Sequence, residues 1–273
     1  MRKFYTVLLF LFVGILLTGC RGQKAYDFET RDTIIVGLEA EYAPYNWATS
    51  VSSDFTFPIN GRKDFADGYD VAMAKKIAEG LGKKLVIKAI DWEGLIPAAE
   101  RGSIDLIIAG MTPTPLREQS ILFSDEYYRA EPVIVLRKDS SYANATSIND
   151  FSGAKIIAQM STIYETLVEQ VNGAIPQTSL KDYADLKLSI ENKGSDIMIA
   201  ELPVAIGMVN KNDDLTYIRF EEGNGFVVDT KQVIVSIGMT LINTELKARI
   251  DAILDLISHE ERDLIMDAAI KRQ

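Results

Sequence analysis

Short apolar runs alternate with amphipathic helical stretches along the first half of the chain. After Asp70, apolar residues recur at the spacing of one helix face, which predicts a helix capped by Asp70 and ending near Gly80–Gly82. The neighbouring apolar runs are rich in β-branched residues, which favour strands. The predicted order is strand 33–38, the helix from Asp70, strand 84–90, helix 95–100 and strand 104–109. Such an order implies a parallel sheet with helices on its faces.

The second half of the chain repeats this alternation. The pattern predicts strand 132–137, strand 154–160, helix 162–170, helix 186–193, strand 197–200, helix 202–209, strand 215–220 and an extended run at 232–238. Two amphipathic helices, at about 244–258 and 260–271, close the chain. A chain of this length exceeds one ordinary hydrophobic core of about 150 residues and suits two lobes. We therefore expect an α/β protein with two lobes. Periodicity alone does not assign each strand to a lobe.

The first residues have the pattern of an export signal. Arg2 and Lys3 precede an apolar run over 4–17, which is too short for a good membrane span. The run ends in Leu-Thr-Gly-Cys, which is similar to a lipobox and predicts a signal peptide at 1–19 and a lipid on Cys20. Because Cys20 is the only cysteine, an internal disulfide is excluded. The alternative is an uncleaved anchor helix or a buried cysteine. The prediction is an extracytoplasmic protein, lipid-anchored to the cell membrane by a polar tether over 20–32.

Charge and composition exclude several classes of function. Removal of 1–19 leaves 27 basic and 39 acidic residues, so the formal charge moves from −10 to −12. Such a chain does not bind nucleic acid or anionic lipid through bulk charge. His259 is the only histidine, and its charged neighbours indicate a solvent-facing position. Because no His/Cys cluster, phosphate loop or Ser-His-Asp set can be assembled, we expect no metal and no cofactor.

The segment 104–128 carries the clearest candidate chemistry. Its apolar run ends at Ala109 and Gly110, a Thr-Pro-Thr-Pro turn follows, and Arg117 stands just beyond. In open α/β folds, ligands lie outside the carboxyl ends of strands. A guanidinium matches a carboxylate with two parallel hydrogen bonds, and a glycine allows a ligand to approach the backbone. The segment therefore predicts a site for a small carboxylate. The alternative is a surface arginine at the start of a helix.

The motif D-x-I-x-A-G-M-T-x-T-x-x-R followed by F-S-D-x-Y-Y resembles a known family. EYAPYNW (41–47), GYDVAMAKKIAEGLG (68–82) and WEGLIPA (92–98) resemble it as well. The family is that of amino-acid-binding proteins of ABC importers, the type II periplasmic binding proteins (bacterial extracellular solute-binding protein family 3). The similarity covers most of the chain after residue 33 and breaks between Asn46 and Gly68, where this chain is longer.

The resemblance implies a fold of two open sheets with flanking helices, joined by a two-strand hinge. The chain would cross between lobes near 131–136 and 228–236. Lobe 1 would then comprise 33–131 plus 232–273, and lobe 2 would comprise 132–231. The function implied is a monomeric receptor that binds a free L-amino acid between the lobes and delivers it to the permease subunits of an ABC transporter.

A free amino acid presents a carboxylate, an ammonium group and a side chain, and a buried site must satisfy each charge. For the carboxylate we expect Arg117, assisted by Ala109, Gly110 and Thr112 from lobe 1. Lobe 2 would add Gln159, Ser161 and Thr162, where a strand meets a helix N-terminus. The family commonly has glycine in place of Ser161. The alternative role for Thr162, apart from the family resemblance, is that of an ordinary helix N-cap.

The resemblance places Glu201 at the ammonium group, where the family usually has aspartate. Apart from the resemblance, Glu201 is interpreted as a carboxylate that stabilises a helix N-terminus. Tyr42 and Trp92 match the aromatic residues that sandwich the ligand in the family, although either could be a core residue. Glu39 matches an acidic residue that meets the distal group of the ligand, or it is a solvated charge at a strand end.

Net acidity, Glu39 and the aromatic pair favour arginine, lysine or histidine as the ligand. Glutamine and cystine remain open. An enzyme related to dehydratases, or a sensor, on the same fold is the alternative class, because a fold does not fix a function.

Overall fold

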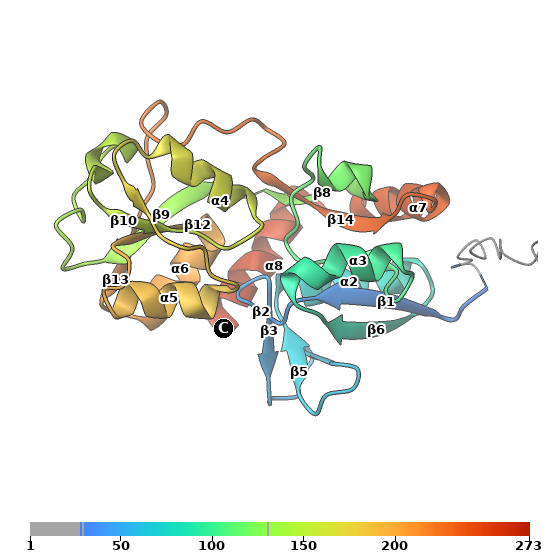
Figure 1. Ribbon diagram of the computed structural model, residues 1–273. Coiled ribbons are helices and arrows are strands. Elements are labelled where there is room, and N and C mark those ends of the chain that lie inside the picture. Colours follow the sequence, from blue (N-terminus) through green and yellow to red (C-terminus); the bar gives the residue numbers. More distant parts are fainter. Residues whose placement is uncertain (1–27, 29, 130) are drawn as a thin grey trace, which may run out of the picture.

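The computed structural model describes residues 28, 30–129 and 131–273, and it has two lobes, each built on a five-stranded sheet (Figure 1). The predicted signal peptide and Cys20 lie outside the described residues. The first sheet has the strand order β6-β1-β7-β14-β8. These strands are β1 (Thr33–Leu38), β6 (Lys84–Ala89), β7 (Leu106–Ile107), β8 (Ile121–Arg129) and β14 (Ile234–Thr240). β1 runs parallel to β6 and β7, whereas β14 is antiparallel to β7 and β8.

The second sheet has the order β11-β10-β12-β9-β13. Its strands are β9 (Pro132–Arg137), β10 (Lys155–Ile157), β11 (Ile175–Pro176), β12 (Ile197–Glu201) and β13 (Leu215–Ile218). Both sheets are mixed rather than purely parallel, because β9 and β14 each run against their neighbours. In both cases the antiparallel strand is one by which the chain enters a sheet from the other lobe.

Helices flank both sheets, as the α/β pattern predicts. The first lobe has α2 (Tyr69–Gly80), the 3-10 turns η1 (Trp92–Gly94) and η2 (Arg117–Gln119), α3 (Leu95–Glu100) and α7 (Thr244–Leu254). The second lobe has η3 (Ile148–Phe151), α4 (Ile163–Leu167), η4 (Val168–Gln170), α5 (Tyr183–Glu191) and α6 (Leu202–Lys211). The predicted two-lobe α/β fold with two open sheets is confirmed.

The lobes are joined where the chain passes from β8 to β9 and again on its way from β13 to β14 (Figure 1). The last helix, α8 (His259–Arg272), contacts both α2 of the first lobe and α6 of the second. A buried apolar cluster accordingly continues from one lobe into the other, from Ile34 under the first sheet to Met198 in the second. The terminal helix is therefore a shared support and does not belong to one lobe alone.

Asp70 does not cap α2, contrary to the sequence-based prediction. Gly68 occupies the N-cap position with φ 129°, and a side chain there would approach the Tyr45 carbonyl oxygen to 2.2 Å. Asp70 lies inside the first turn and is fully buried, where it accepts hydrogen bonds from Asn46 Nδ2 at 2.7 Å and the Tyr127 hydroxyl at 2.6 Å. Burial raises the pKa of Asp70 to about 6. Its role is to join the start of α2 to β3 (Asn46–Thr49) and to β8.

Several predicted elements differ in extent from those observed. The strands expected at 104–109 and 154–160 pair over shorter stretches, Leu106–Ile107 and Lys155–Ile157, because sheet pairing depends on partner strands that periodicity does not show. The helix expected from residue 186 begins earlier, at Tyr183, since the Asp182 side chain accepts a hydrogen bond from the Asp185 amide and caps it.

The stretch in which the family resemblance breaks supplies three strands of a small separate sheet, and the EYAPYNW motif supplies the fourth, β2 (Glu41–Tyr42). β2 (Glu41–Tyr42), β3 (Asn46–Thr49), β4 (Phe57–Pro58) and β5 (Phe65–Asp67) pair in the order β2-β3-β5-β4. This sheet extends below the first lobe in Figure 1. Arg272 of α8 pairs with Asp67 at 2.9 Å and lies 4.1 Å from the centre of the Phe55 ring. The C-terminal helix therefore also fixes this sheet.

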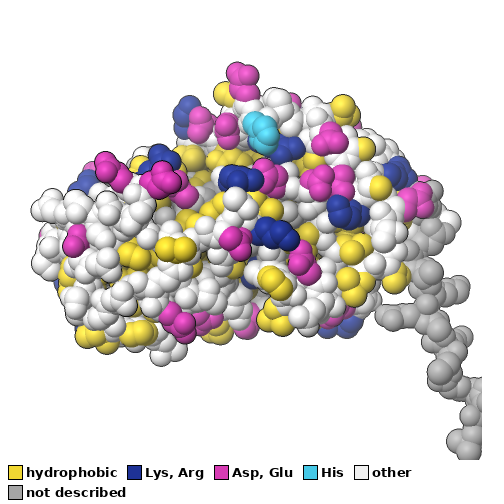
Figure 2. All heavy atoms as spheres, turned by 90° about the horizontal axis from the view of Figure 1, so that it is seen from above, with side chains coloured by type: hydrophobic (Ala, Val, Ile, Leu, Met, Phe, Trp, Pro, Cys, Tyr) yellow, Lys and Arg dark blue, Asp and Glu magenta, His cyan; other side chains and the backbone are white. Residues whose placement is uncertain are grey.

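The folded region begins before residue 33, where the tether was expected to end. Phe28 is buried, and Arg31 pairs with Asp105 at 2.5 Å. Among the described residues, no helix is long and apolar enough to cross a membrane. Over the face shown in Figure 2, Lys and Arg side chains are interspersed with Asp and Glu.

Candidate binding cleft between the lobes

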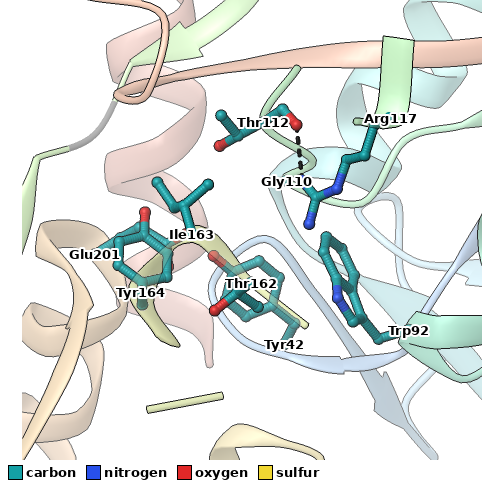
Figure 3. A pocket seen from close by; sticks show the side chains of 9 residues that line it. All are labelled: Tyr42, Trp92, Gly110, Thr112, Arg117, Thr162, Ile163, Tyr164 and Glu201. Carbon is teal, nitrogen blue, oxygen red and sulfur yellow. Dashed lines mark hydrogen bonds between the residues drawn. The ribbon is translucent and has the colours of Figure 1, made fainter. Parts of the chain in front are cut away.

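A pocket lies between the two lobes, close to the carboxyl ends of strands from both sheets. Its lining consists of Tyr42, Trp92, Gly110, Thr112, Arg117, Thr162, Ile163, Tyr164 and Glu201 (Figure 3). Seven of these nine residues are sequence-predicted site residues; Ile163 and Tyr164 are the additions. The enclosed space is only about 10 Å³, which is room for roughly one water molecule. A larger ligand can therefore enter only when the lobes separate.

Arg117 is the cationic group of this pocket. Its Nη1 donates to the Thr112 carbonyl at 2.7 Å, and its Nη2 donates across the cleft to the Ser161 carbonyl at 3.0 Å. The guanidinium lies 5.0 Å from the centre of the Trp92 ring. Within the described part of the chain, no carboxylate forms an ion pair with it. Desolvation lowers the pKa of Arg117 to about 10, so the group stays charged at neutral pH.

Glu201 is the anionic group on the other side of the pocket (Figure 3). It ends β12 and is only 3% exposed, and the Tyr183 hydroxyl donates to its Oε2 at 3.4 Å. Burial raises the pKa of Glu201 to about 7, opposed by hydrogen bonds from the Tyr42, Tyr164 and Tyr183 hydroxyls. Hydroxyl groups are its partners, and no cation forms an ion pair with it among the described residues. The pocket thus holds a half-buried guanidinium and a buried carboxyl group that do not pair with each other.

Glu39 is not part of the pocket lining, but it interacts electrostatically with Tyr183, whose hydroxyl donates to Glu201. Oε1 of Glu39 accepts a hydrogen bond from Gln159 Nε2 of the second lobe at 3.2 Å, and its Oε2 is buried with no partner in the described structure. Burial raises the pKa of Glu39 to about 8; Glu41 and Asp182 add to the rise, while Gln159 and Lys181 oppose it. A buried carboxylate oxygen without a donor is a costly feature that a cation or an amide of a ligand would satisfy.

Tyr42 and Trp92 do not present free ring faces to a ligand in this closed arrangement. The Tyr42 ring stacks on Tyr45 at 4.8 Å on one side and on Tyr183 at 5.2 Å on the other. The Trp92 ring faces the Arg117 guanidinium. Tyr183 belongs to the second lobe, so separation of the lobes would uncover one face of Tyr42. The sandwich predicted for Tyr42 and Trp92 requires that movement.

Gly110 has a structural reason to be glycine. Its φ is 60°, and a side chain would approach Tyr42 Cε1 to 2.6 Å. The amide that we expected to face the ligand instead donates to the Tyr127 hydroxyl at 2.8 Å. Ala109 is fully buried in the first lobe. Contacts to a ligand from this strand end would therefore come from Thr112 rather than from the Gly110 amide.

The strand-to-helix turn of the second lobe contributes less directly than expected. Thr162 lines the pocket, but its hydroxyl donates back to the Gln159 carbonyl at 2.8 Å and does not cap α4. Gln159 Nε2 is shared between Glu39 and the Lys181 carbonyl. Ser161 lies outside the pocket lining and bonds to the first lobe.

Sequence reasoning missed Tyr164 and Tyr183. Tyr164 stands two residues after Thr162, so its place in the first turn of α4 was a usable signal. Tyr183 had none, because the predicted start of α5 excluded it. In the described ranges, no group of His, Cys, Asp and Glu side chains is arranged to hold a metal ion.

Residues 34–268 match the bacterial extracellular solute-binding proteins, family 3. The chain belongs to this family. It is 29% identical over 220 residues to the arginine-binding extracellular protein ArtP of Bacillus subtilis, a match that covers 79% of each chain. It is also 29% identical over 233 residues to a probable histidine-binding protein of Campylobacter jejuni, covering 83% of this chain and 85% of that one.

The fold of this solute-binding protein is similar to that of solved family members. An ancestral arginine-binding protein bound to glutamine superimposes with a TM-score of 0.71 at 26% identity, covering 87% of this chain and 97% of the ancestral protein. The family and the two-lobe fold expected from the sequence motifs are thereby confirmed.

Proposed function

We propose that this solute-binding protein captures a free basic L-amino acid, arginine foremost, between its lobes and delivers it to the permease of an ABC transporter. One observation carries the proposal. The pocket contains a half-buried guanidinium, Arg117, and a buried carboxylate, Glu201, that have no ion-pair partner among the described residues. An α-amino acid carries the complementary pair of charges on one carbon atom, so its carboxylate matches Arg117 and its ammonium group matches Glu201.

Glu39 is the reason for preferring a basic side chain. Its Oε2 is buried without a hydrogen-bond partner in the described structure, within electrostatic range of Tyr183, which contacts Glu201. A guanidinium or ammonium group at the end of the ligand would pair with this oxygen, and the gain is large because the site is dry. The similarity to an arginine-binding protein and to a probable histidine-binding protein supports the same choice.

Glutamine is the second candidate, because its amide can also donate to Glu39, and an ancestral arginine-binding relative was solved with glutamine bound. Cystine stays open as a ligand of the same type. An enzyme or sensor on this fold is less well supported, since Glu201, the natural general base, faces the position assigned to an ammonium group.

A thermal-shift screen of the delipidated protein against the twenty amino acids, ornithine and cystine tests the proposal. A ligand at 100 times its Kd should add about 2.7 kcal/mol to the free energy of unfolding. We expect the largest shift with arginine and a smaller shift with glutamine. Calorimetry that detects no binding of any free amino acid would refute amino-acid capture altogether.

The export, anchoring and assembly predictions complete the proposal. Cleavage before Cys20 would place a lipid anchor on the outer side of the cell membrane, and the chain would work as a monomer without a cofactor or metal. Cys20→Ser should release the protein from the membrane fraction into the medium, whereas retention would indicate an uncleaved anchor. The boundaries 33–131 plus 232–273 and 132–231 stay the proposed lobes, supported by the two sheets.

A further inference from the structure

Ser161 has an unusual backbone conformation for its residue type. Its φ is 61°, in the left-handed region that glycine adopts readily and other residues rarely adopt. Only Ala40 and Lys193 share this feature among the non-glycine residues of the described chain. Backbone strain of this kind persists only where the surroundings hold it in place, and it gathers at functional sites.

Hydrogen bonds involving the polar groups of Ser161 keep its backbone in this conformation. Its carbonyl accepts from Arg117 Nη2 at 3.0 Å and from Trp92 Nε1 at 3.3 Å, and its hydroxyl donates to Glu93 Oε1 at 3.0 Å. All three partners belong to the first lobe. The Ser161 amide donates to Glu165 Oε2 of its own lobe at 2.9 Å. One residue of the second lobe is therefore bonded to three side chains of the first.

The contact with Arg117 leaves that side chain able to bind a ligand. A guanidinium has five N–H donors, and two are used here, one on the Thr112 carbonyl and one on the Ser161 carbonyl. The remaining donors suffice for the two parallel bonds of a carboxylate. Bonds to two carbonyls, one in each lobe, and contact with the Trp92 ring fix the plane in which those donors point.

A neighbouring contact between the lobes involves no residue of the pocket lining. Lys181 pairs with Asp91 at 3.0 Å, but the two side chains are 51% and 75% exposed. Exposed ion pairs contribute little, because water and salt screen them. Ser161 is exposed as well, but its carbonyl bonds to Arg117, a half-buried side chain that lines the pocket.

We propose that Ser161 is a positioning residue of the carboxylate clamp: its left-handed backbone turns its carbonyl onto Arg117 and Trp92 as the lobes close, and its hydroxyl fastens that backbone to Glu93. This inference rests on the proposed amino-acid binding. It assigns Ser161 a role through Arg117 in place of the direct ligand contact that the sequence suggested.

Three substitutions of Ser161 distinguish the role of its carbonyl from the role of its hydroxyl. Ser161→Gly adopts the left-handed conformation without strain, Ser161→Ala keeps the strain without the fastening hydroxyl, and Ser161→Val is disfavoured there by its β-branch. The readout is the ratio of affinities for arginine and for agmatine, which lacks the α-carboxylate, measured by calorimetry. We expect the glycine variant to keep the wild-type ratio within about twofold, the alanine variant to lose about threefold and the valine variant about tenfold.

A matched control exists in the second lobe. Lys193 has φ 62° and takes no part in the pocket, so Lys193→Val imposes similar backbone strain elsewhere. It should lower the melting temperature and leave the ratio unchanged. In a Trp47→Phe background, Trp92 is the only tryptophan, and the change in its emission on adding arginine should follow the same order of variants.

The ranking of the variants by their arginine-to-agmatine affinity ratio tests the positioning role even if the valine variant does not fold. Equal ratios in the alanine and glycine variants would overturn the positioning role, since a simple hydroxyl contact predicts equality. An unchanged ratio in a folded valine variant would overturn it as well. Absence of arginine binding by the wild-type protein would instead refute the proposed function.

Discussion

The two sides of the cleft are built on different electrostatic principles. The first lobe supplies Arg117, a cation that contacts carbonyl groups and an aromatic ring. Arg117 stays charged at any physiological pH. The second lobe supplies Glu201, a carboxyl group whose hydrogen-bond partners are tyrosine hydroxyls. Burial raises the pKa of Glu201 to about 7. Each lobe supplies an ionisable group without an ion-pair partner among the described residues. Under the proposed function, a zwitterion would balance both groups at once and so couple ligand binding to closure of the lobes.

The comparison also shows where the site is sensitive to its surroundings. Hydroxyl groups around Glu201 rotate and can accept as well as donate, so this side tolerates both protonation states. Carbonyl groups only accept, and thus the Arg117 side tolerates no loss of the cation. The following predictions test this asymmetry, beginning with the largest effect.

Arg117→Ala should reduce arginine affinity most. The substitution leaves the α-carboxylate of the ligand and the Thr112 carbonyl without their donor and the Ser161 carbonyl with Trp92 Nε1 alone, a loss of about 3 kcal/mol or more, equal to roughly 100-fold in Kd. Calorimetry with arginine measures it. Arg117→Lys should recover only part of the loss, because an ammonium group cannot form two parallel bonds. Full recovery in the lysine variant would contradict the clamp geometry.

Glu201→Gln should weaken binding less, by about 2 kcal/mol or roughly 30-fold. The amide keeps an acceptor for the tyrosine hydroxyls and resembles the protonated carboxyl, so the melting temperature of the ligand-free protein should not fall. A loss as large as that of Arg117→Ala would show that the two sides are equivalent after all. Competition binding against arginine on both variants gives the comparison directly.

Arginine affinity should fall by at least about tenfold between pH 8 and pH 6. Glu39 and Glu201, with pKa values raised to about 8 and about 7, must lose protons to pair with a cationic ligand. The ligand-free protein should show the opposite trend. The folded state retains these protons above their ordinary pKa of 4.5, so the stability they contribute is lost as pH rises toward 8.

Glu39→Gln serves as the control for this pH dependence. It removes the group with the higher pKa, so the change of arginine affinity with pH should shrink and shift to lower pH. Glutamine affinity, which does not need a charge at Glu39, should change by less than about threefold. A pH profile that is identical in the variant and the wild-type protein would remove Glu39 from the site.

Tyr183→Phe should have the smallest effect. The ring still stacks on Tyr42, and only a hydroxyl bond of 3.4 Å to Glu201 is lost, so arginine affinity should change by no more than about 1 kcal/mol. Because that hydroxyl lowers the pKa of Glu201, the pH midpoint of binding should move upward. A downward movement would mean that the hydroxyl does not donate to the carboxylate.

The sequence by itself determined the alternation of strands and helices, the solute-binding family, and the charged residues at strand ends. Arg117 and Glu201 were recognisable because each follows an apolar run at a strand's carboxyl edge, and that placement is a local property of the chain. The extra stretch between Asn46 and Gly68 was visible too, but not that it pairs into a separate sheet.

Only the tertiary structure decided how the two lobes meet. Gln159 bonds to Glu39 across 120 residues, and Arg117 reaches Ser161 across 44. Tyr183 covers the Tyr42 ring, and Asp70 serves the core instead of a helix end. The contacts of Gln159, Arg117 and Tyr183 join groups from separate lobes, and that of Asp70 joins distant parts of one lobe. Their energies depend on burial and distance, which periodicity along a single chain does not encode.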